Sequence, residues 1–317
     1  MTASEFTLDL RDEPRRRWQL DAERVHQARE LLRSYGQELG VSPLLAAGMS
    51  AMVRPHLAPE HWAEIEGIAA GLGVPLHEAL LGNLYYDALK FVLGCTAIAV
   101  DTPSGPLHAR NLDWWTANRM LADFCLLTRF EHAPAGPFVT VGWPGFAGAL
   151  SGLAPGRFAV TLNAALSDER GQLAAPITFL IRTVLERAAS YAEAVELLTE
   201  TRIACDCLLL VTGIGPGELV VIERTPTRHA LRQPEGGVLH VTNEFRLIEV
   251  RPGAPRNELQ RTSCGRFERM GELLAREQPA DFAACFAHLS DPAVKMEITV
   301  QQMAFHARSG EFEVRIP

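Results

Sequence analysis

The feature that most constrains the fold is a change of sequence pattern at Cys95. After this residue, short runs of β-branched and other apolar residues follow one another, separated by glycine and proline, and each run predicts a strand. The predicted strands cover residues 96–101, 124–130, 137–142, 157–163, 205–213, 218–224, 237–242, about 295–305 and about 311–316. Helical periodicity interrupts them at about 177–200 and 258–276, with a further helix expected at 280–289. Strands and helices grouped in blocks indicate an α+β fold rather than regular βαβ repeats.

The chain ahead of this boundary is predicted to be mostly helical. Asp21 is suited to cap a helix whose apolar residues share one face, namely Val25, Ala28, Leu31, Leu32 and Tyr35. Pro59 is suited to open a second helix, and residues 76–90 form a third candidate. We therefore expect two parts: a helical N-terminal segment of residues 1–94, packed on the core, and a layered α+β domain of residues 95–317.

Composition excludes several classes of function. The net charge of −8 over 317 residues argues against a dedicated nucleic-acid-binding protein, because phosphate contacts need concentrated Lys and Arg. The beginning of the sequence carries charges where a signal peptide has its apolar core, and no run of about 18 apolar residues occurs. We expect a cytoplasmic protein with no nucleic-acid partner and no stable membrane association. The sequence leaves the oligomeric state open.

The six cysteines are predicted to be free thiols rather than disulfides, as is usual for a long cytoplasmic chain. They stand at positions 95, 125, 205, 207, 264 and 285. Cys205 and Cys207 are one residue apart in a strand-like run and would face the same side. No second pair of cysteines or histidines completes a zinc site with them. No metal and no organic cofactor is expected.

The stretch "LGCTAIAVDTPSGPLHARNLDWW", residues 93–115, concentrates groups that could activate a thiol. A cysteine thiol with a pKa of about 8.5 is mostly protonated at neutral pH, so a nucleophilic Cys95 needs a base. His108 held by Asp113 could supply one. The alternative is the α-amine of Cys95 itself, which titrates at about pH 8 and becomes available only if the bond between Gly94 and Cys95 is cut. Spacing leaves both mechanisms open.

The same stretch resembles the start of the catalytic subunit in the acid ceramidase and N-acylethanolamine acid amidase family. These are N-terminal-nucleophile (Ntn) cysteine hydrolases, related to penicillin acyltransferase and choloylglycine hydrolase, whose precursors cleave themselves before the cysteine. Further blocks resemble this family in the same order: "FTLDLRDEPRRRW", "EIEGIAAGLGVPLHEALLGNLYYD", "TFLIRTVLERAASYAEAVELL", "VTNEF", "QRTSCGRFERM" and "KMEITVQQMAFHARSGEFEVRI". The resemblance covers most of the chain. It implies an αββα sandwich, in which two antiparallel sheets lie between layers of helices.

The resemblance also implies roles for individual residues. Cys95 matches the nucleophile, and Arg110 and Asp113 match the arginine and aspartate that orient or polarise its amine and thiol. Asn243 matches the asparagine whose side-chain amide helps to form the oxyanion hole. Arg261 lies in a block where the family has paired arginines, although the first of the pair is glutamine here.

Strand geometry adds an expectation about this site. Residues of an ideal strand alternate between its faces, so Arg110 and Asp113 cannot both point at Cys95 from a regular strand. Strands at functional sites often carry bulges. We therefore predict a turn or a bulge near Asn111.

Further residues are candidates for substrate binding. Asn163 stands where penicillin-acylase-like enzymes have an asparagine near the site. Trp114, Trp115, Trp143 and Phe146 are candidates for an acyl-chain pocket, since apolar clefts with few polar groups hold lipid-like ligands. Each of these aromatic residues fits an ordinary core position equally well.

The expected function is that of a self-processing Ntn cysteine amidase. It would hydrolyse the linear amide of an N-acylated amine or amino acid, a small-molecule substrate, through a thioester on Cys95. Three alternatives stay open: an acyltransferase that passes the acyl group to an amine, an uncleaved non-catalytic homologue that binds a ligand, and a Cys–His–Asp hydrolase that depends on His108. The acyltransferase shares its nucleophile and oxyanion hole with the amidase, so sequence alone does not separate the two.

Overall fold

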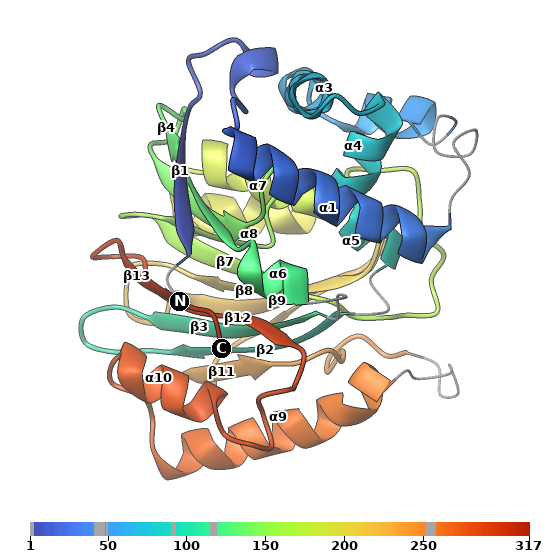
Figure 1. Ribbon diagram of the computed structural model, residues 1–317. Coiled ribbons are helices and arrows are strands. Elements are labelled where there is room, and N and C mark those ends of the chain that lie inside the picture. Colours follow the sequence, from blue (N-terminus) through green and yellow to red (C-terminus); the bar gives the residue numbers. More distant parts are fainter. Residues whose placement is uncertain (1–2, 41–47, 49, 90–92, 115–118, 251–257) are drawn as a thin grey trace.

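Two β-sheets face each other, and helices cover the outer side of each sheet (Figure 1). The computed structural model describes residues 3–40, 48, 50–89, 93–114, 119–250 and 258–317. The larger sheet contains, in spatial order, β1 (Ser4–Asp9), β4 (Leu126–Glu131), β5 (Phe138–Gly142), β6 (Ser151–Ala154), β7 (Phe158–Asn163), β8 (Cys207–Thr212), β9 (Leu219–Arg224) and β10 (His229–Arg232). The smaller sheet contains β11 (Val238–Val241), β2 (Leu93–Val100), β3 (Leu107–Trp114), β12 (Thr299–His306) and β13 (Glu311–Arg315).

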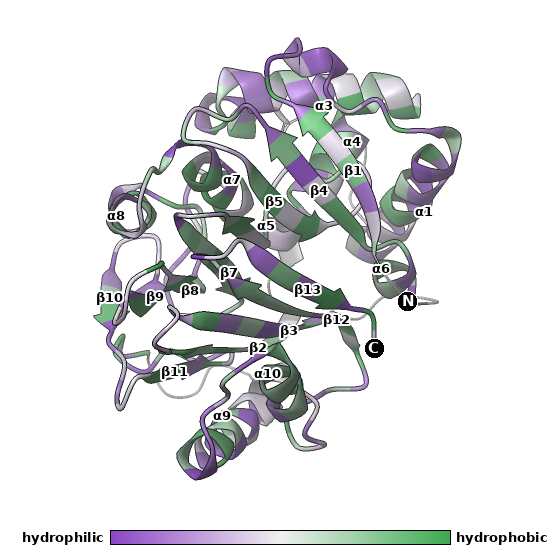
Figure 2. Ribbon diagram, turned by 90° about the vertical axis from the view of Figure 1, so that its left-hand side faces the viewer, coloured by the Kyte–Doolittle hydropathy of each residue, from purple (hydrophilic) through white to green (hydrophobic). Residues whose placement is uncertain are grey.

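Helices form the two outer layers. Helices α7 (Ile177–Arg187) and α8 (Tyr191–Glu200) pack on the larger sheet, whereas α9 (Glu258–Arg276) and α10 (Phe282–Leu289) pack on the smaller one. Hydrophobic residues concentrate in the strands of both sheets, while α9 mixes hydrophobic and hydrophilic residues along its length, as expected of a helix that buries one side (Figure 2). The order of layers confirms the predicted αββα sandwich. Every described helix is too short or too polar to span a membrane.

The N-terminal segment contains the predicted helices and, in addition, a strand. Its helices are α1 (Ala22–Leu39), α3 (Pro59–Leu72), α4 (Leu76–Asn83) and α5 (Tyr85–Leu89), with 3-10 turns at Pro14–Arg16 and Arg54–His56. Asp21 caps α1, because its side chain accepts a hydrogen bond from the backbone N of Arg24 at 2.9 Å. The strand β1, which pairs in parallel with β4, was not predicted within this mostly helical segment. The apolar residues of β1 that alternate are only Phe6 and Leu8, which is too short a pattern to predict a strand. Its extended conformation depends on pairing with β4.

Most other elements agree with the sequence pattern. Each of the nine predicted runs contains one strand of the structure. Strands β3, β6 and β10 were outside the prediction, and β3 carries polar residues on both faces that obscure its alternation. The predicted helix over 177–200 is two helices. The first ends at Arg187, where the backbone of Ala188 becomes extended, and Ser190 caps the second by accepting from the backbone N of Glu193. A further short helix, α6 (Met120–Asp123), lies beside β12.

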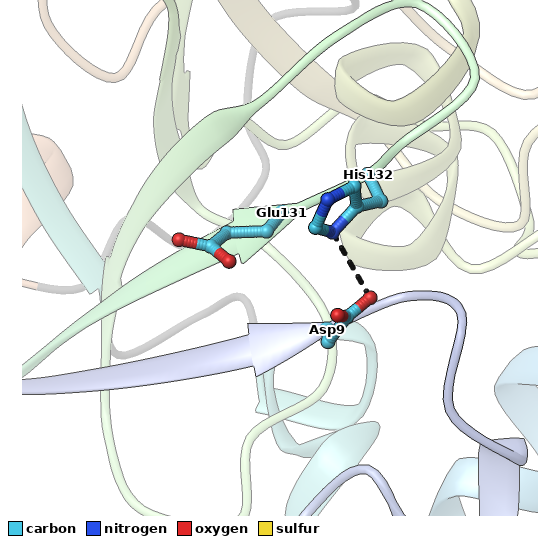
Figure 3. Close-up of side chains that lie close together, drawn as sticks. All are labelled: Asp9, Glu131 and His132. Carbon is cyan, nitrogen blue, oxygen red and sulfur yellow. Dashed lines mark hydrogen bonds and ion pairs between the residues drawn. The ribbon is translucent and has the colours of Figure 1, made fainter.

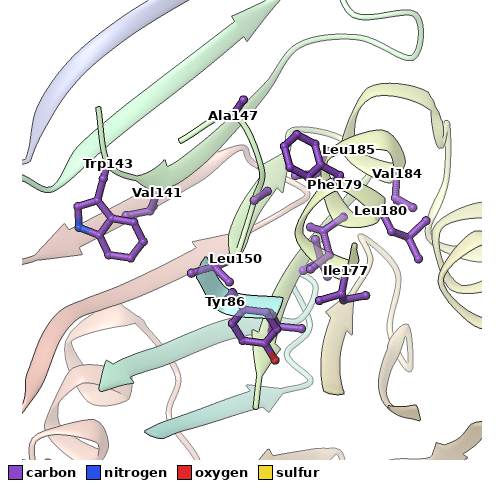
Figure 4. Packing of buried hydrophobic residues seen from close by; sticks show 14 of the residues in the cluster. Tyr86, Val141, Trp143, Ala147, Leu150, Ile177, Phe179, Leu180, Val184 and Leu185 are labelled. Atoms are coloured by element: carbon purple, nitrogen blue, oxygen red, sulfur yellow. The ribbon is translucent and has the colours of Figure 1, made fainter. Parts of the chain in front are cut away.

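The segment of residues 1–94 and the rest of the chain share one hydrophobic core (Figure 4). Tyr86 of α5 belongs to the same cluster as Leu150 and Ile177, which lie near β6 and at the start of α7. Burial of apolar surface is the main favourable term in association, so the segment is an integral layer of the molecule. Cleavage at its end stays a prediction.

A network of buried ion pairs also ties the N-terminal segment to α7. The carboxylate of Glu64, 0% exposed, accepts from Arg17 Nη1 at 2.9 Å and from Trp18 Nε1 at 2.8 Å. Arg182 of α7 reaches the same carboxylate at 3.4 Å and pairs with Glu186 at 2.6 Å. Buried charges are costly unless they are paired, so this network fixes how α3 lies against α7.

Alternation along β2 assigns each side chain to one of two layers. Ala97 and Ala99 pack toward the larger sheet, whereas Ile98 packs with Met270 of α9. Cys95 has the same parity as Ala97, so its side chain faces the space between the two sheets. The nucleophile candidate is therefore enclosed by both sheets.

Strand β3 runs antiparallel to β2 in an unbroken register along its whole length. The irregularity lies in β12 instead, between Thr299 and Gln301. The predicted turn or bulge near Asn111 is therefore wrong. A regular β3 places Arg110 on the face of Cys95 and Asp113 on the opposite face, toward α9. Residues of β3 thus alternate between its faces as expected, and the strand needs no bulge because Asp113 does not point at Cys95.

Candidate active site

Cys95 is buried between the sheets, with 1% of the residue exposed. The Nη2 atom of Arg110 donates a hydrogen bond to Cys95 Sγ at 2.9 Å. The guanidinium is itself fixed, because it also donates to Leu150 O at 2.9 Å, to Ser151 Oγ at 2.6 Å and to Leu162 O. An immobile positive charge therefore lies against the sulfur, where charge-assisted hydrogen bonds are strong.

Asn243, two residues beyond β11, binds the backbone of Cys95. Its Oδ1 atom accepts from Cys95 N at 3.0 Å and from Arg266 Nη2 at 2.9 Å, and its Nδ2 atom donates to Ala164 O at 2.9 Å. Two donors at Oδ1 and an acceptor at Nδ2 leave a single orientation for the amide. The backbone N of Asn243 donates to Ser263 Oγ of α9 at 3.0 Å, which anchors the loop.

Arg266 of α9 is the site residue that sequence reasoning missed. Its Nη1 atom donates to Cys95 O at 2.7 Å and to Thr96 Oγ1 at 2.9 Å, and its Nη2 atom donates to Asn243. Burial lowers the pKa of Arg266, while Asp113 and other acidic neighbours raise it. One guanidinium thus connects the nucleophile's carbonyl with the amide that binds the nucleophile's nitrogen.

Arg261, the arginine of this block that the sequence suggested as a site candidate, is exposed on α9. Five residues separate it from Arg266, which on a helix is a rotation of roughly 140° between the two side chains. The site therefore takes Arg266 and leaves Arg261 in solvent, which corrects the sequence-based assignment. Ser263, Arg266 and Met270 are all buried, and this i, i+3, i+7 spacing is the signal that could have identified the inward face.

Asp113 acts from the other face of β3. Its Oδ1 atom accepts from Thr299 Oγ1 at 2.6 Å, and its Oδ2 atom lies 4.0 Å from Arg266 Nη1. Burial raises the pKa of Asp113, although Arg266, Thr299 and Arg110 lower it. Asp113 therefore reaches the backbone of Cys95 through Arg266, whereas Arg110 touches the thiol directly.

Asn163, at the end of β7, supports the loop that carries Asn243. Its Nδ2 atom donates to Val241 O at 3.2 Å and to Thr242 O at 2.9 Å. These bonds join the larger sheet to the end of β11 in the smaller sheet. The structure thus brings Asn163 to the site as a support for the backbone around Asn243.

His108 is placed away from the thiol and has both ring nitrogens in use. It contacts Thr212 Oγ1 at 3.1 Å and Thr161 Oγ1 at 2.8 Å, which links β3 to the larger sheet. It pairs with Ala99, four residues along β2 from Cys95, a distance of about 13 Å along a strand. Burial, assisted by Arg110, lowers the pKa of His108 to about 3. The imidazole is therefore a neutral link between sheets rather than a base for Cys95.

Three of the four aromatic candidates line one cavity. Trp114, Trp143 and Phe146 share it with Tyr85 and Tyr86, and helices α1, α3 and α4 complete its wall. The fourth candidate, at position 115, lies outside the described residues. The cavity has a volume of about 30 Å³, enough for one or two water molecules. Its lining is mostly apolar and lies between the N-terminal segment and the larger sheet.

Among the described residues, Asp9, Glu131 and His132 are the group whose side chains could hold a metal ion (Figure 3). They lie at the ends of β1 and β4. Arg11 already pairs with the Asp9 carboxylate at 2.6 Å, and His132 contacts it at 3.1 Å. The Arg11 hydrogen bond lowers the pKa of Asp9. A bound guanidinium occupies the ligand position that a cation would need, so we assign no metal to this group.

Comparison with known proteins places the site in a family. Residues 100–306 match the family described as acyl-coenzyme A:6-aminopenicillanic acid acyl-transferase. Acid ceramidase of Balaenoptera acutorostrata scammoni is 28% identical over 284 residues, which cover 79% of this chain and 68% of the relative. The N-acylethanolamine-hydrolyzing acid amidase of Caenorhabditis elegans is 31% identical over 177 residues, 51% of this chain and 50% of the relative. Both relatives are amide-hydrolysing enzymes, in agreement with the predicted class of enzyme.

The solved structure of the Caenorhabditis elegans N-acylethanolamine-hydrolyzing acid amidase ortholog has the same fold. It superimposes with a TM-score of 0.56 at 22% identity and covers 70% of this chain and 100% of that one. The family match extends over more than half of the chain and includes Arg110, Asp113, Asn243 and Arg266. The chain therefore belongs to the acyl-coenzyme A:6-aminopenicillanic acid acyl-transferase family, which confirms the resemblance to Ntn cysteine hydrolases.

Proposed function

We propose that the protein is a self-processing Ntn cysteine amidase that hydrolyses the linear amide of an N-acylated amine or amino acid. One observation carries this proposal. The thiol, the nitrogen and the carbonyl oxygen of Cys95 are held by three different buried side chains, Arg110, Asn243 and Arg266. A cysteine that only fills a core needs no guanidinium against its thiol, and its backbone groups are ordinarily paired with neighbouring backbone rather than with distant side chains.

Self-processing supplies the base that the uncleaved chain lacks. In the proposed step, Cys95 Sγ attacks the carbonyl carbon of Gly94, the bond to Cys95 N breaks, and the thiol proton passes to that nitrogen. Water then hydrolyses the resulting thioester and leaves residues 1–94 with a free carboxylate. The released α-amine is the base, since His108 lies too far along β3 and both of its ring nitrogens are bonded.

Substrate turnover repeats this chemistry on an external amide. Cys95 Sγ attacks the acyl carbonyl, and Asn243 Nδ2 binds the oxyanion. The Cys95 amine takes the thiol proton and passes it to the departing amine of the substrate. A water molecule, activated by the same amine, then releases the acyl group from the thioester. Arg110 stabilises the charge on sulfur throughout.

The aromatic cavity is the proposed site of the acyl group. Trp114, which follows Asp113 on β3, brings this cavity close to the chemistry, and the lining by Trp143 and Phe146 suits an apolar chain. At about 30 Å³ it is too small for an acyl chain as it stands. The acyl chain of the substrate can enter only when the wall formed by the N-terminal helices moves. Because these helices belong to the segment of residues 1–94, we propose that cleavage after Gly94 allows this movement.

The experiment is the intact mass of purified protein, wild type beside Cys95→Ala. Cleavage in the wild type alone, with fragments of residues 1–94 and 95–317, supports self-processing by Cys95. The cleaved protein is then assayed for release of amine from N-acyl amides of varied chain length. A wild type that stays whole at every pH, or cleaved protein that hydrolyses no amide, contradicts the proposal. If the wild type stays whole, ligand binding that survives Cys95→Ala would favour a non-catalytic binding protein.

A second candidate is acyl transfer, favoured by the description of the family as an acyl-transferase. An acceptor amine would then take the place of water in the attack on the thioester. Product analysis with and without an added amine separates the two functions. New amide in the presence of the amine, at the expense of free acid, establishes transfer, and free acid alone establishes hydrolysis.

A further inference from the structure

Two hydrogen bonds to one oxygen place Arg266 beside the nitrogen of Cys95. Cys95 N and Arg266 Nη2 both donate to Asn243 Oδ1, at 3.0 Å and 2.9 Å. Arg266 Nη1 also donates to Cys95 O at 2.7 Å. The guanidinium thus binds the carbonyl oxygen of Cys95 directly and is linked to its nitrogen through Asn243 Oδ1. Arg266 Nη2 lies within about 6 Å of that nitrogen, a range at which charges in proteins interact strongly.

We propose that Arg266 is a positioning residue that keeps the α-amine of Cys95 neutral, and therefore able to act as a base, at working pH. The inference rests on the proposed function, since the amine exists only after cleavage. Pairing of Cys95 with Leu112 holds the new chain end in place, so the amine inherits the position of the peptide nitrogen and its acceptor, Asn243 Oδ1. A protonated amine there would face the fixed charge of Arg266.

The size of the effect follows from Coulomb's law. Two positive charges about 5 to 6 Å apart in a site with an effective dielectric constant of about 20 repel each other enough to lower the pKa of the amine by about two units. An ordinary α-amine has a pKa of about 7.7 to 8.0. The amine of Cys95 would then titrate at about pH 6 and be mostly neutral at pH 7.

Other charges around the amine act in both directions. From β3, Arg110 contacts the sulfur and adds repulsion of the same sign. Asp113, 4.0 Å from Arg266, opposes it; burial raises the pKa of Asp113, while Arg266, Thr299 and Arg110 lower it. Glu244, which accepts from the thiol of Cys264 on α9, also attracts Arg266. Arg266 shares with the amine the acceptor Asn243 Oδ1, so its charge is held within about 6 Å of the amine nitrogen.

Two further titratable groups of the described residues, His108 and Tyr86, carry no charge that could act on the amine. His108 on β3 is uncharged above about pH 3 because burial lowers its pKa. Tyr86 on α5 keeps its proton because burial raises its pKa well above the usual range. Neither group can replace the charge of Arg266. The acid limb of the activity profile should therefore report on the guanidinium groups of Arg266 and Arg110, and substitution of Arg266 alone isolates its share.

The sign of the test follows directly. Turnover needs the neutral amine, so kcat/KM falls as the pH drops through the pKa of the amine. Arg266→Gln removes the charge but keeps a side chain that can donate to Cys95 O. The amine should then titrate up to about two units higher, and the acid limb should move to higher pH by the same amount. Arg266→Lys keeps the charge and should shift the limb by much less.

The experiment measures the pH dependence of kcat/KM for wild type, Arg266→Gln and Arg266→Lys. Arg276→Gln, an exposed cation at the end of the same helix, is the control and should leave the limb unchanged. Nitrogen NMR of the self-cleaved protein, labelled at cysteine, titrates the amine directly and needs no variant. A wild-type amine that titrates at about pH 8 overturns the inference even if Arg266→Gln fails to fold.

The outcomes separate the inference from the function on which it rests. Absence of a fragment that begins at Cys95, or absence of any amide hydrolysis, contradicts the proposed function itself. Cleaved, active enzyme whose acid limb is the same in wild type and Arg266→Gln overturns only the role of Arg266. A limb that moves up in Arg266→Gln and stays in place in Arg276→Gln supports it, because a purely structural contact would lower the rate equally at every pH.

Discussion

Arg266 donates a hydrogen bond to the carbonyl oxygen of Cys95 at 2.7 Å, across 171 positions of sequence. The contact joins α9 to β2, and Asn243, from the loop after β11, joins both. The candidate site therefore combines one local unit, the β2–β3 pair with Cys95 and Arg110, and two distant elements that bring a guanidinium and an amide. Its chemistry depends on how the sheet and the helix layer are docked.

The amide of Asn243 offers a direct test of the oxyanion assignment. Asn243→Ala removes the Nδ2 donor and should lower kcat by about 10²- to 10³-fold, the usual cost of losing one oxyanion-hole donor. Asn243→Asp keeps an acceptor for Cys95 N and Arg266 but has no amide donor, so it should still cleave itself while turnover stays low. The measurement is single-turnover acyl transfer to Cys95. Near wild-type acylation in the alanine variant would remove Asn243 from the mechanism.

Truncation of Arg266 and of Arg261, both on α9, should destabilise the protein to very different extents. Arg266→Ala leaves the Cys95 carbonyl without its donor and buried Asp113 without its ion pair, so we expect a loss of about 3 kcal/mol or more in the free energy of unfolding. Arg261→Ala removes an exposed side chain and should change the free energy by less than about 0.5 kcal/mol. Urea unfolding of both variants measures this. Comparable losses in the two variants would show that the face of α9 is wrongly assigned.

Glu64 should determine how firmly the N-terminal segment is held. Glu64→Ala leaves Arg17 and Arg182 buried without their shared carboxylate, a change that typically costs about 3–5 kcal/mol. Glu66→Ala is the matched control on the same helix, because its ion pair with Arg15 is exposed and worth at most about 1 kcal/mol. Unfolding in urea gives both values, and gel filtration of cleaved protein tests whether residues 1–94 stay bound. A Glu64 variant as stable as the control would contradict the role of the network.

His108 should make the protein sensitive to acid without taking part in cleavage. The pKa of His108 is lowered to about 3 in the folded chain, against an ordinary value of 6.5, so the unfolded chain binds a proton first as the pH falls. The stability contributed by the neutral imidazole is present above pH 6.5 and is lost progressively as the pH drops toward about 3.

His108→Gln removes this titration and keeps a group that can bond Thr161 or Thr212. Its thermal midpoint should fall less steeply than that of the wild type between about pH 6.5 and pH 4. Cleavage before Cys95 should continue, as judged by intact mass. Amide hydrolysis by an uncleaved wild type that is lost in folded His108→Gln protein would restore the Cys–His–Asp mechanism.

Local sequence signals predicted much of the secondary structure. Asp21 caps α1 because its side chain bonds a backbone N–H three residues ahead, and α9 spans the predicted residues because its apolar residues recur at helical spacing. The neighbourhood of Cys95 and Arg110 was also predictable, since the two residues lie on adjacent strands joined by one turn. All of these depend on interactions between residues close in sequence.

By itself, then, the sequence determined most of the elements and their approximate ends, an α+β class and the residue types gathered around Cys95, while the αββα arrangement came from the family resemblance. Tertiary structure decided the rest. β1 became a strand only because β4 offers an edge to pair with, and Arg266 rather than Arg261 entered the site because one face of α9 meets the smaller sheet. Asp113 serves the site through Arg266 because a regular β3 turns it away from the thiol. Periodicity shows that an element has two faces, but only docking against a distant partner decides what each face contacts.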